Sequence, residues 1–134
     1  MRVKVHELKG ITTELANALK SAGINDSSKF LAAAGKAADR KALAAKYGVD
    51  TRHLLELVNR ADLARIKGVG AVYSDLLENV GVDSVVELRT RNADNLFAKI
   101  GESTEKLGIK RAPRIEEVRK WIEQAKQLER AVHY

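Results

Sequence analysis

The sequence contains no cysteine, a single proline and few aromatic residues, which make up 4% of its 134 positions. Without cysteine there is no disulfide framework and no thiolate chemistry, as is usual in a reducing cytoplasm, where we expect the protein to be located. The scarcity of aromatic side chains argues against a stacking platform for single-stranded nucleic acid. No apolar run approaches the roughly 18 residues of a membrane span, and the N-terminal segment MRVKVHELKG lacks the apolar core of a signal peptide.

Basic residues exceed acidic ones, with 24 Lys and Arg against 18 Asp and Glu, for a net charge of +6. A surplus of this size permits binding to nucleic acid or to another polyanion. Acids and bases are nevertheless interspersed along the chain, which is equally typical of solvated helix surfaces. The length predicts one compact domain that is large enough to bury its own core.

Helix-forming residues dominate the chain, and glycines fall between segments of helical periodicity, so we predict an all-α fold. Polar residues suited to cap helices precede most of these segments. The expected caps are Thr12 or Thr13, Asn25 to Ser28, Asp39, Asp50 or Thr51, Ser84 with Glu87 as a capping box, and Asn92 or Asp94. The glycines expected to end helices are Gly23, Gly35, Gly48 and Gly81.

Three segments have weaker patterns. Residues 1–7 alternate weakly and predict an extended lead-in, and residues 101–112 are expected to be irregular. Pro113 suits the first position of a final long helix. Apolar residues spaced three and four apart predict the buried helix faces. These are Leu15, Ala18, Leu19 and Ala22; Leu54, Leu57, Val58 and Ala61; Leu96, Phe97 and Ile100; and Ile115, Val118, Ile122 and Ala125, with Trp121 beside the last of them.

The sequence repeats itself after 58 residues. Leu8-Lys9-Gly10-Ile11 aligns with Ile66-Lys67-Gly68-Val69, and the apolar positions of the helices that follow coincide. A later match, at a shift of 64, aligns residues 54–61 with 118–125. We therefore predict a single domain, residues 1–134, made of two helical units at about 8–63 and 66–128 that share one core.

Each unit opens with a helix, a glycine-containing hairpin and a second helix, which resembles the helix-hairpin-helix motif of DNA repair and recombination proteins. Within that family the hairpin has the form apolar-x-Gly-apolar-Gly, and its backbone N–H groups hold a DNA phosphate. Residues 66–70 match this form in full, and residues 8–12 match it with Thr12 in place of the second glycine. The resemblance implies two fused helix-hairpin-helix repeats, which are SAM-like helical units, in one all-α domain.

The whole chain is similar to an uncharacterised bacterial family of tandem helix-hairpin-helix domains, a family of domains of unknown function. The residues that carry the similarity are Leu8 to Ile11, Ala61-Asp62-Leu63, Leu76-Leu77 with Gly81-Val82-Asp83, Arg111-Ala112-Pro113, and Trp121-Ile122 with Ala125-Lys126. The similarity implies a compact all-α domain and brings no function with it.

The hairpins are the candidate functional sites. Consecutive backbone donors at the start of a helix favour an anion, and the helix dipole adds to this preference. The candidate nucleic-acid-binding residues are Lys67, Gly68, Gly70, Lys9, Gly10 and Arg65. DNA-binding hairpins usually carry a basic residue just after the second glycine, whereas Asp75 and Glu78 follow here, so the glycines also fit a purely structural turn.

Two alternative patterns compete with the hairpins. Residues at about 40–60 resemble a bacterial helix-turn-helix with Gly48 in the turn, and within that family the second helix enters the major groove. Thr51, Arg52, His53 and Asn59 would then face bases. A basic run could form an electrostatic footprint, although interleaved glutamates indicate a salt-bridged surface. The run consists of Lys106, Lys110, Arg111, Arg114, Arg119 and Lys120.

Catalysis has little support. The histidines His6, His53 and His133 do not have the spacing of metal ligands, so we expect no metal, no cofactor and no small-molecule substrate. Asp83 faintly resembles the catalytic aspartate of helix-hairpin-helix glycosylases, but the activating lysine is absent and the chain is short for a base-flipping pocket. We expect a non-enzymatic module that binds duplex DNA without sequence preference or, alternatively, a protein-interaction or structural scaffold that keeps the fold without DNA binding.

Overall fold

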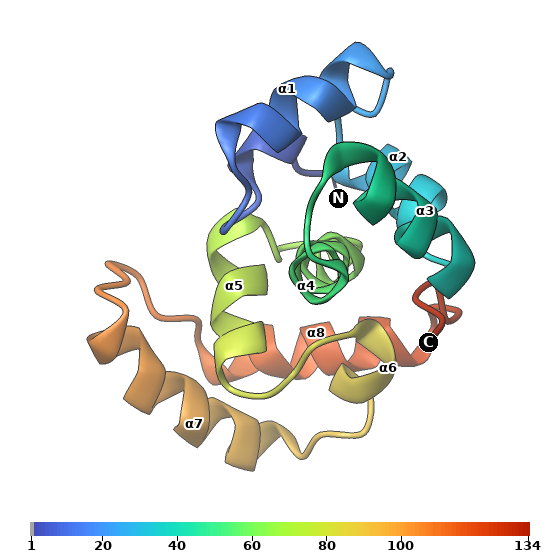
Figure 1. The fold of residues 1–134 in the computed structure, drawn as a ribbon. Helices are drawn as coiled ribbons and strands as arrows, with labels where there is room; N and C mark the ends of the chain where they lie inside the picture. Colours follow the sequence, from blue (N-terminus) through green and yellow to red (C-terminus); the bar gives the residue numbers. More distant parts are fainter. Residues whose placement is uncertain (1) are drawn as a thin grey trace.

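The computed structural model describes residues 2–134, and within that range the chain forms one 3-10 helix and eight α-helices without a β-strand (Figure 1). The all-α class expected from the composition is therefore confirmed. In chain order the elements are η1 (Val5–Glu7), α1 (Thr13–Ser21), α2 (Ser27–Ala34), α3 (Ala37–Tyr47), α4 (Thr51–Leu63), α5 (Ala71–Asn79), α6 (Val85–Leu88), α7 (Ala93–Lys106) and α8 (Ile115–Lys126).

Most helices begin where the sequence predicts a cap. A side-chain oxygen accepts a backbone N–H from the first helical turn at Thr12, Asp26, Asp50, Ser84 and Asn92. The helix α3 differs, because it begins at Ala37 with Lys36 at the cap position. Asp39 therefore lies inside the first turn of α3, where its carboxylate faces the positive end of the helix dipole.

The prediction of an irregular segment over 101–112 is wrong for its first half. The helix α7 continues through Gly101 to Lys106 because Leu96, Ile100 and Thr104 repeat every four residues on its buried side. Glycine lowers the stability of a helix without forbidding it, and here the periodic burial on either side outweighs that local cost.

Two smaller expectations near α7 are also corrected. Pro113 precedes α8 rather than occupying its first position, because Arg114 is the residue that caps this helix. Phe97 is 38% exposed instead of belonging to the core, because only the neighbouring face of α7 packs against α8 and α5. Of the extended lead-in predicted over residues 1–7, residue 1 lies outside the described residues, and the prediction holds only as far as Lys4, which forms an isolated bridge with Asp26 before η1 begins.

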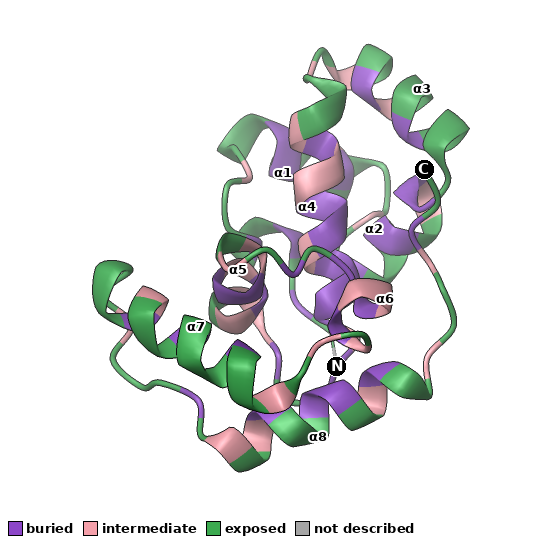
Figure 2. Cartoon of the chain, turned by 90° about the horizontal axis from the view of Figure 1, so that it is seen from below, coloured by how far each residue is buried: buried purple, intermediate pink, exposed green. Residues whose placement is uncertain are grey.

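The helix α4 lies at the centre of the fold and contacts α2, α3 and α5 (Figure 2). Its predicted apolar face is confirmed, since Leu54, Leu57, Val58 and Ala61 are each no more than 1% exposed. Burial of a side chain of this size stabilises the folded state by about 1.5–3 kcal/mol. Two clusters of buried apolar side chains meet where α4 ends, one from residues 3–64 together with Val132 and the other from residues 63–125.

The residues after α8 return to the first half of the chain. Val132 is 1% exposed within the first apolar cluster, and the His133 N–H donates to the Gly35 carbonyl at 2.8 Å. The buried guanidinium of Arg40 donates to the carbonyl oxygens of Ala34 and Gly35 at 3.1 and 2.6 Å, and to that of His133 at 2.5 Å. These bonds join the C-terminal tail to the corner between α2 and α3.

Gly35 lies where this tail crosses the corner, and we expect Gly35→Ala to lower the free energy of unfolding by about 1–3 kcal/mol. A Cβ atom at position 35 would lie 2.4 Å from the Ala131 carbonyl oxygen and 2.8 Å from that of Leu31, both backbone atoms that cannot rotate away. Urea unfolding measures the change.

The matched control is Gly101→Ala, whose Cβ would meet no atom within 4 Å. Because Gly101 lies inside α7, we expect this change to raise the free energy of unfolding by up to about 1 kcal/mol through helix propensity. A Gly35→Ala variant as stable as the native protein would mean that the tail does not pack at this corner.

Candidate nucleic-acid interface

Two tight turns precede α1 and α5, and we call them the Gly10 turn (residues 8–12) and the Gly68 turn (residues 66–70). Gly10 has φ of 87° and Gly68 has φ of 94°, a region in which glycine is strongly favoured. Ile11 N–H donates to the Leu8 carbonyl at 3.3 Å in the first turn. In the second, the equivalent bond runs from Val69 N–H to the Ile66 carbonyl at 3.0 Å, so the two backbones close in the same way.

The helix that follows each turn is capped differently. The Thr12 hydroxyl accepts the Leu15 N–H at 3.2 Å and so closes the start of α1. The helix α5 begins after Gly70, which has no side chain to cap it. The first N–H of α5 to bond into the helix is that of Ser74, to the Gly70 carbonyl at 2.9 Å. The N–H groups of residues 71–73 therefore point out of the start of α5, as unfilled donors at a helix N-terminus do.

Gly70 is not required by its own backbone conformation. Its φ is −102°, and Thr12 occupies the equivalent position in the Gly10 turn with φ of −82°. Any residue adopts such values. Glycine at this position therefore leaves no side chain in front of the free N–H groups at the start of α5.

The backbone of the Gly68 turn is anchored to α8. The Lys67 N–H donates to Gln124 Oε1 at 2.9 Å, and Gln124 Nε2 donates to the Lys67 carbonyl at 3.2 Å. Below Gly68, a Cβ atom would lie 3.3 Å from the indole nitrogen of Trp121. The side chain of Lys67 is exposed, but its N–H already has a partner and is not a donor for an anion.

Arg65 is engaged within the protein. Its guanidinium donates to the Asp62 carboxylate at 2.8 Å and to the Glu129 carbonyl at 2.9 Å. Asp62 is 1% exposed, and its second carboxylate oxygen accepts the Val85 N–H at 2.8 Å. This pair links the end of α4 to the start of α6 and to the segment after α8, a structural role that the sequence did not indicate.

The acidic residues of α5 are held by an arginine from α4. Arg60 lies 3.2 Å from the Asp75 carboxylate and 3.6 Å from that of Glu78. Burial raises the pKa of the Glu78 carboxyl from 4.5 to about 7, with Arg60 opposing the shift and the carboxylates of Glu56, Asp83 and Asp75 adding to it. The guanidinium of Arg60 therefore offsets part of the negative charge that these two carboxylates bring to α5.

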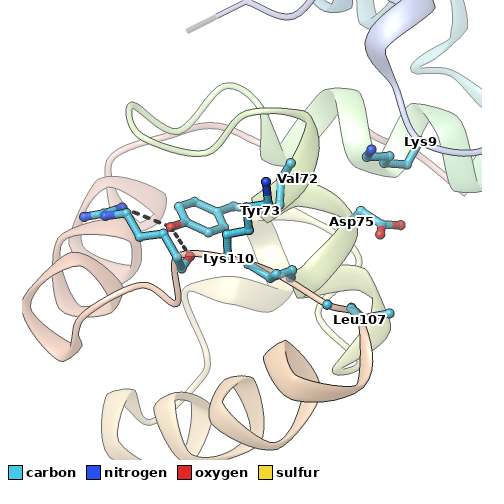
Figure 3. A pocket seen from close by; sticks show the side chains of 9 residues that line it. Lys9, Val72, Tyr73, Asp75, Leu107 and Lys110 are labelled. Carbon is cyan, nitrogen blue, oxygen red and sulfur yellow. Dashed lines mark hydrogen bonds between the residues drawn. The ribbon is translucent and has the colours of Figure 1, made fainter.

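A cavity of about 570 Å³ lies between the Gly10 turn, the start of α5 and the segment after α7 (Figure 3). Its wall is fixed by Tyr73, whose hydroxyl donates to the Arg111 carbonyl at 2.8 Å and accepts from the Arg111 guanidinium at 3.0 Å. The large apolar side chains at its mouth, Val72 and Leu107, are 46% and 42% exposed. The residues that line it are Lys9, Val72, Tyr73, Asp75, Leu107, Gly108, Ile109, Lys110 and Arg111.

The family model for the domain of unknown function DUF4332 matches residues 9–128. The chain belongs to the DUF4332 family. No curated protein and no solved structure matches it. The sequence-based assignment to a family of domains of unknown function is thus confirmed, and the match covers residues 9–12 of the Gly10 turn, the whole Gly68 turn and every residue that lines the cavity.

The burial of α4 contradicts part of the helix-turn-helix interpretation of this DUF4332 chain. Asn59 is 5% exposed, so its predicted exposure to bases is wrong: tertiary packing covers it along with the rest of the middle of α4. Thr51 and Arg52, at the start of α4, are exposed, while His53 is half-buried beside Glu56. Only the first turn of α4 could therefore reach a groove.

The basic run is partly neutralised. Glu117 lies 2.8 Å from Arg111 and 3.6 Å from Arg114, and Asp94 lies 3.6 Å from Arg119. These pairs agree with the interpretation as a salt-bridged surface. Among the described residues, no group of three or more His, Asp or Glu side chains could hold a metal ion, and no helix is long and apolar enough to cross a membrane.

The raised pKa of Glu78 makes stability depend on pH. Its folded-state pKa of about 7 lies above the ordinary 4.5, so the folded protein retains this proton more tightly than the unfolded chain does. Its contribution to the free energy of unfolding is fully present below about pH 4.5 and is lost as the pH rises through about 7.

We expect Glu78→Gln to reduce the fall in unfolding free energy between pH 5 and pH 8, as measured by urea unfolding, because the amide does not titrate. Glu102→Gln, at an exposed position on α7, is the control and should leave the fall unchanged. If the free energy of unfolding fell equally between pH 5 and pH 8 in the native protein and in Glu78→Gln, the raised pKa of Glu78 would be contradicted.

Proposed function

We propose that this domain consists of two fused helix-hairpin-helix repeats, at about residues 8–63 and 66–128, and that it binds duplex DNA without sequence preference through the second repeat's hairpin. The uncapped start of α5 beside the exposed Lys67 carries the proposal. A DNA phosphate there would accept hydrogen bonds from the backbone N–H groups of Gly68 and Gly70 and from those of residues 71–73. Lys67, and Lys9 from the Gly10 turn, would add positive charge.

The equivalence of the two repeats is supported beyond the turns themselves. The helices α1 and α5 both end before a glycine with positive φ, 82° at Gly23 and 92° at Gly81. After each glycine the chain returns a hydrogen bond to the helix, from Ile24 N–H to the Leu19 carbonyl at 2.8 Å and from Val82 N–H to the Leu77 carbonyl at 2.9 Å. These features recur at the 58-residue shift of the sequence repeat.

The two hairpins would contribute unequally. The Thr12 hydroxyl accepts the Leu15 N–H, so this donor after the Gly10 turn is not free for a phosphate. Gly10 and Lys9 would therefore supply a weaker contact with DNA than the glycines of the second hairpin. The ion pairs of Arg60 with Asp75 and Glu78 weaken the repulsion that these acids would otherwise exert on a phosphate. We leave Arg65 out of the proposed contact, because Asp62 and the Glu129 carbonyl engage its guanidinium.

A protein-interaction scaffold is the alternative function. The exposure of Val72 and Leu107 at the mouth of the cavity favours it, because phosphate recognition has no use for apolar side chains. A protein-interaction or structural scaffold of this kind would keep the fold without binding DNA.

Titration of fluorescently labelled duplex DNA tests the proposal. Counterion release predicts that a site making two to four phosphate contacts loses affinity about 10- to 100-fold between about 50 mM and about 200 mM salt. Lys67→Glu should weaken binding to every sequence alike, whereas Lys99→Glu, the same charge change on the exposed side of α7, should have a smaller effect. Absence of binding at the lower salt would sink the DNA proposal, and a clear sequence preference would favour the helix-turn-helix alternative.

Gly70→Ser tests the role of the open helix start directly. Because Gly70 has φ of −102°, serine fits the backbone and should cap α5 as Thr12 caps α1. We expect DNA affinity to fall several-fold while thermal stability is kept or raised. DNA affinity that is unchanged in a variant of native stability would place the phosphate contact elsewhere.

A further inference from the structure

We propose that the cavity beside the Gly10 turn is a docking site for a partner protein's peptide segment, one that presents a large apolar side chain flanked by carboxylates. This inference does not require DNA binding, because the side chains of Val72, Leu107 and Lys110 take no part in the proposed phosphate contact, and only Lys9 belongs to both surfaces. It rests on the size of the cavity, on its apolar wall and on the charges at its rim.

The cavity has the size and the lining of a side-chain pocket. Its volume of about 570 Å³ falls within the range of ligand sites, about 300–1,000 Å³. Val72 enters from α5, while Leu107 and Ile109 enter from the segment after α7, so two parts of the chain supply its apolar surface (Figure 3). Exposed apolar side chains that gather at one pocket mark an interaction site more strongly than the same side chains scattered singly.

The wall of the cavity is already organised without a ligand. Tyr73 is held by both of its hydrogen bonds to Arg111, and its ring packs against Trp121 with a centroid separation of 5.3 Å. Trp121 is itself 2% exposed in the core. A partner that docks here would not have to order this wall, which lowers the entropic cost of binding.

Charge at the rim selects an acidic partner. Lys9 lines the cavity from the Gly10 turn and Lys110 from the segment after α7, and within the described residues neither has a carboxylate at ion-pair distance. The acid of the rim, Asp75, is bound by Arg60, and Arg111 is bound by Glu117. The charges left for a ligand are therefore the two ammonium groups, which complement carboxylates on either side of an apolar anchor.

A peptide ligand accounts for both the lysines and the exposed apolar side chains of the cavity better than duplex DNA does. DNA would satisfy Lys9 and Lys110, but its phosphate backbone has no apolar group to cover Val72 and Leu107. Burial of an apolar anchor between these side chains would supply affinity, while the lysines would orient the segment and discriminate against basic sequences.

Selection from a displayed library of random dodecapeptides against the intact protein tests this proposal, followed by fluorescence anisotropy with labelled copies of the enriched peptides. We expect enriched peptides to combine a large apolar residue with neighbouring Asp or Glu. Leu107→Gln and Lys110→Glu should each weaken their binding about fivefold or more. Circular dichroism and thermal unfolding verify that these exposed substitutions leave the fold intact.

Matched variants separate the site from general surface effects. Phe97→Gln removes a comparably exposed apolar side chain from α7, and Lys99→Glu makes the same charge change outside the cavity. Both should bind the peptides as the native protein does. No enrichment above the empty support, enriched peptides without acidic residues, or equal losses in the control variants would each overturn the proposal.

The result is distinguishable from that of the DNA experiment. Leu107→Gln should keep native DNA affinity, and Lys67→Glu should keep native peptide affinity. Loss of both activities in both variants would mean one shared surface and would contradict a separate peptide site.

Discussion

The burial of α4 is the constraint on which the rest of the structure depends. Its apolar face carries the first cluster of buried side chains, and its last residue, Leu63, belongs to the second cluster. The Gly68 turn follows within a few residues, so its position is set by where α4 ends. A change that shifted α4 would therefore move the turn, the start of α5 and one wall of the cavity together.

Polar side chains at the end of α4 fix the electrostatics of the candidate surface. Arg60 binds the acids of α5, and Asp62 accepts the Val85 N–H that starts α6 while it pairs with Arg65. A buried charge with all its partners present is tolerated, whereas removal of one partner is strongly destabilising. The same interactions that hold α4 against its neighbours thus offset part of the negative charge of α5.

The sequence predicted well those features that depend on a few neighbouring residues. The caps at Thr12, Asp50 and Ser84 and the left-handed glycine at Gly48 are local, because each is decided by contacts within one helical turn. The sequence-based predictions fail where tertiary contacts outweigh a local sequence signal. Gly101 does not end α7, because Thr104 and Ile100 are buried on either side of it in register with the rest of the helix.

There is a physical reason why some features follow from the sequence and others only from the tertiary structure. Sequence alone determined the helical class, most helix boundaries, the inward face of α4 and the matching turns, since periodicity, capping and positive φ are properties of short segments. Only the tertiary structure decided that Gln124 occupies the Lys67 N–H, that Arg60 pairs with Asp75 and Glu78, and that Lys9 shares a cavity with Leu107. Those residues are far apart in the chain, and no local pattern records which of them the packing of the helices brings together.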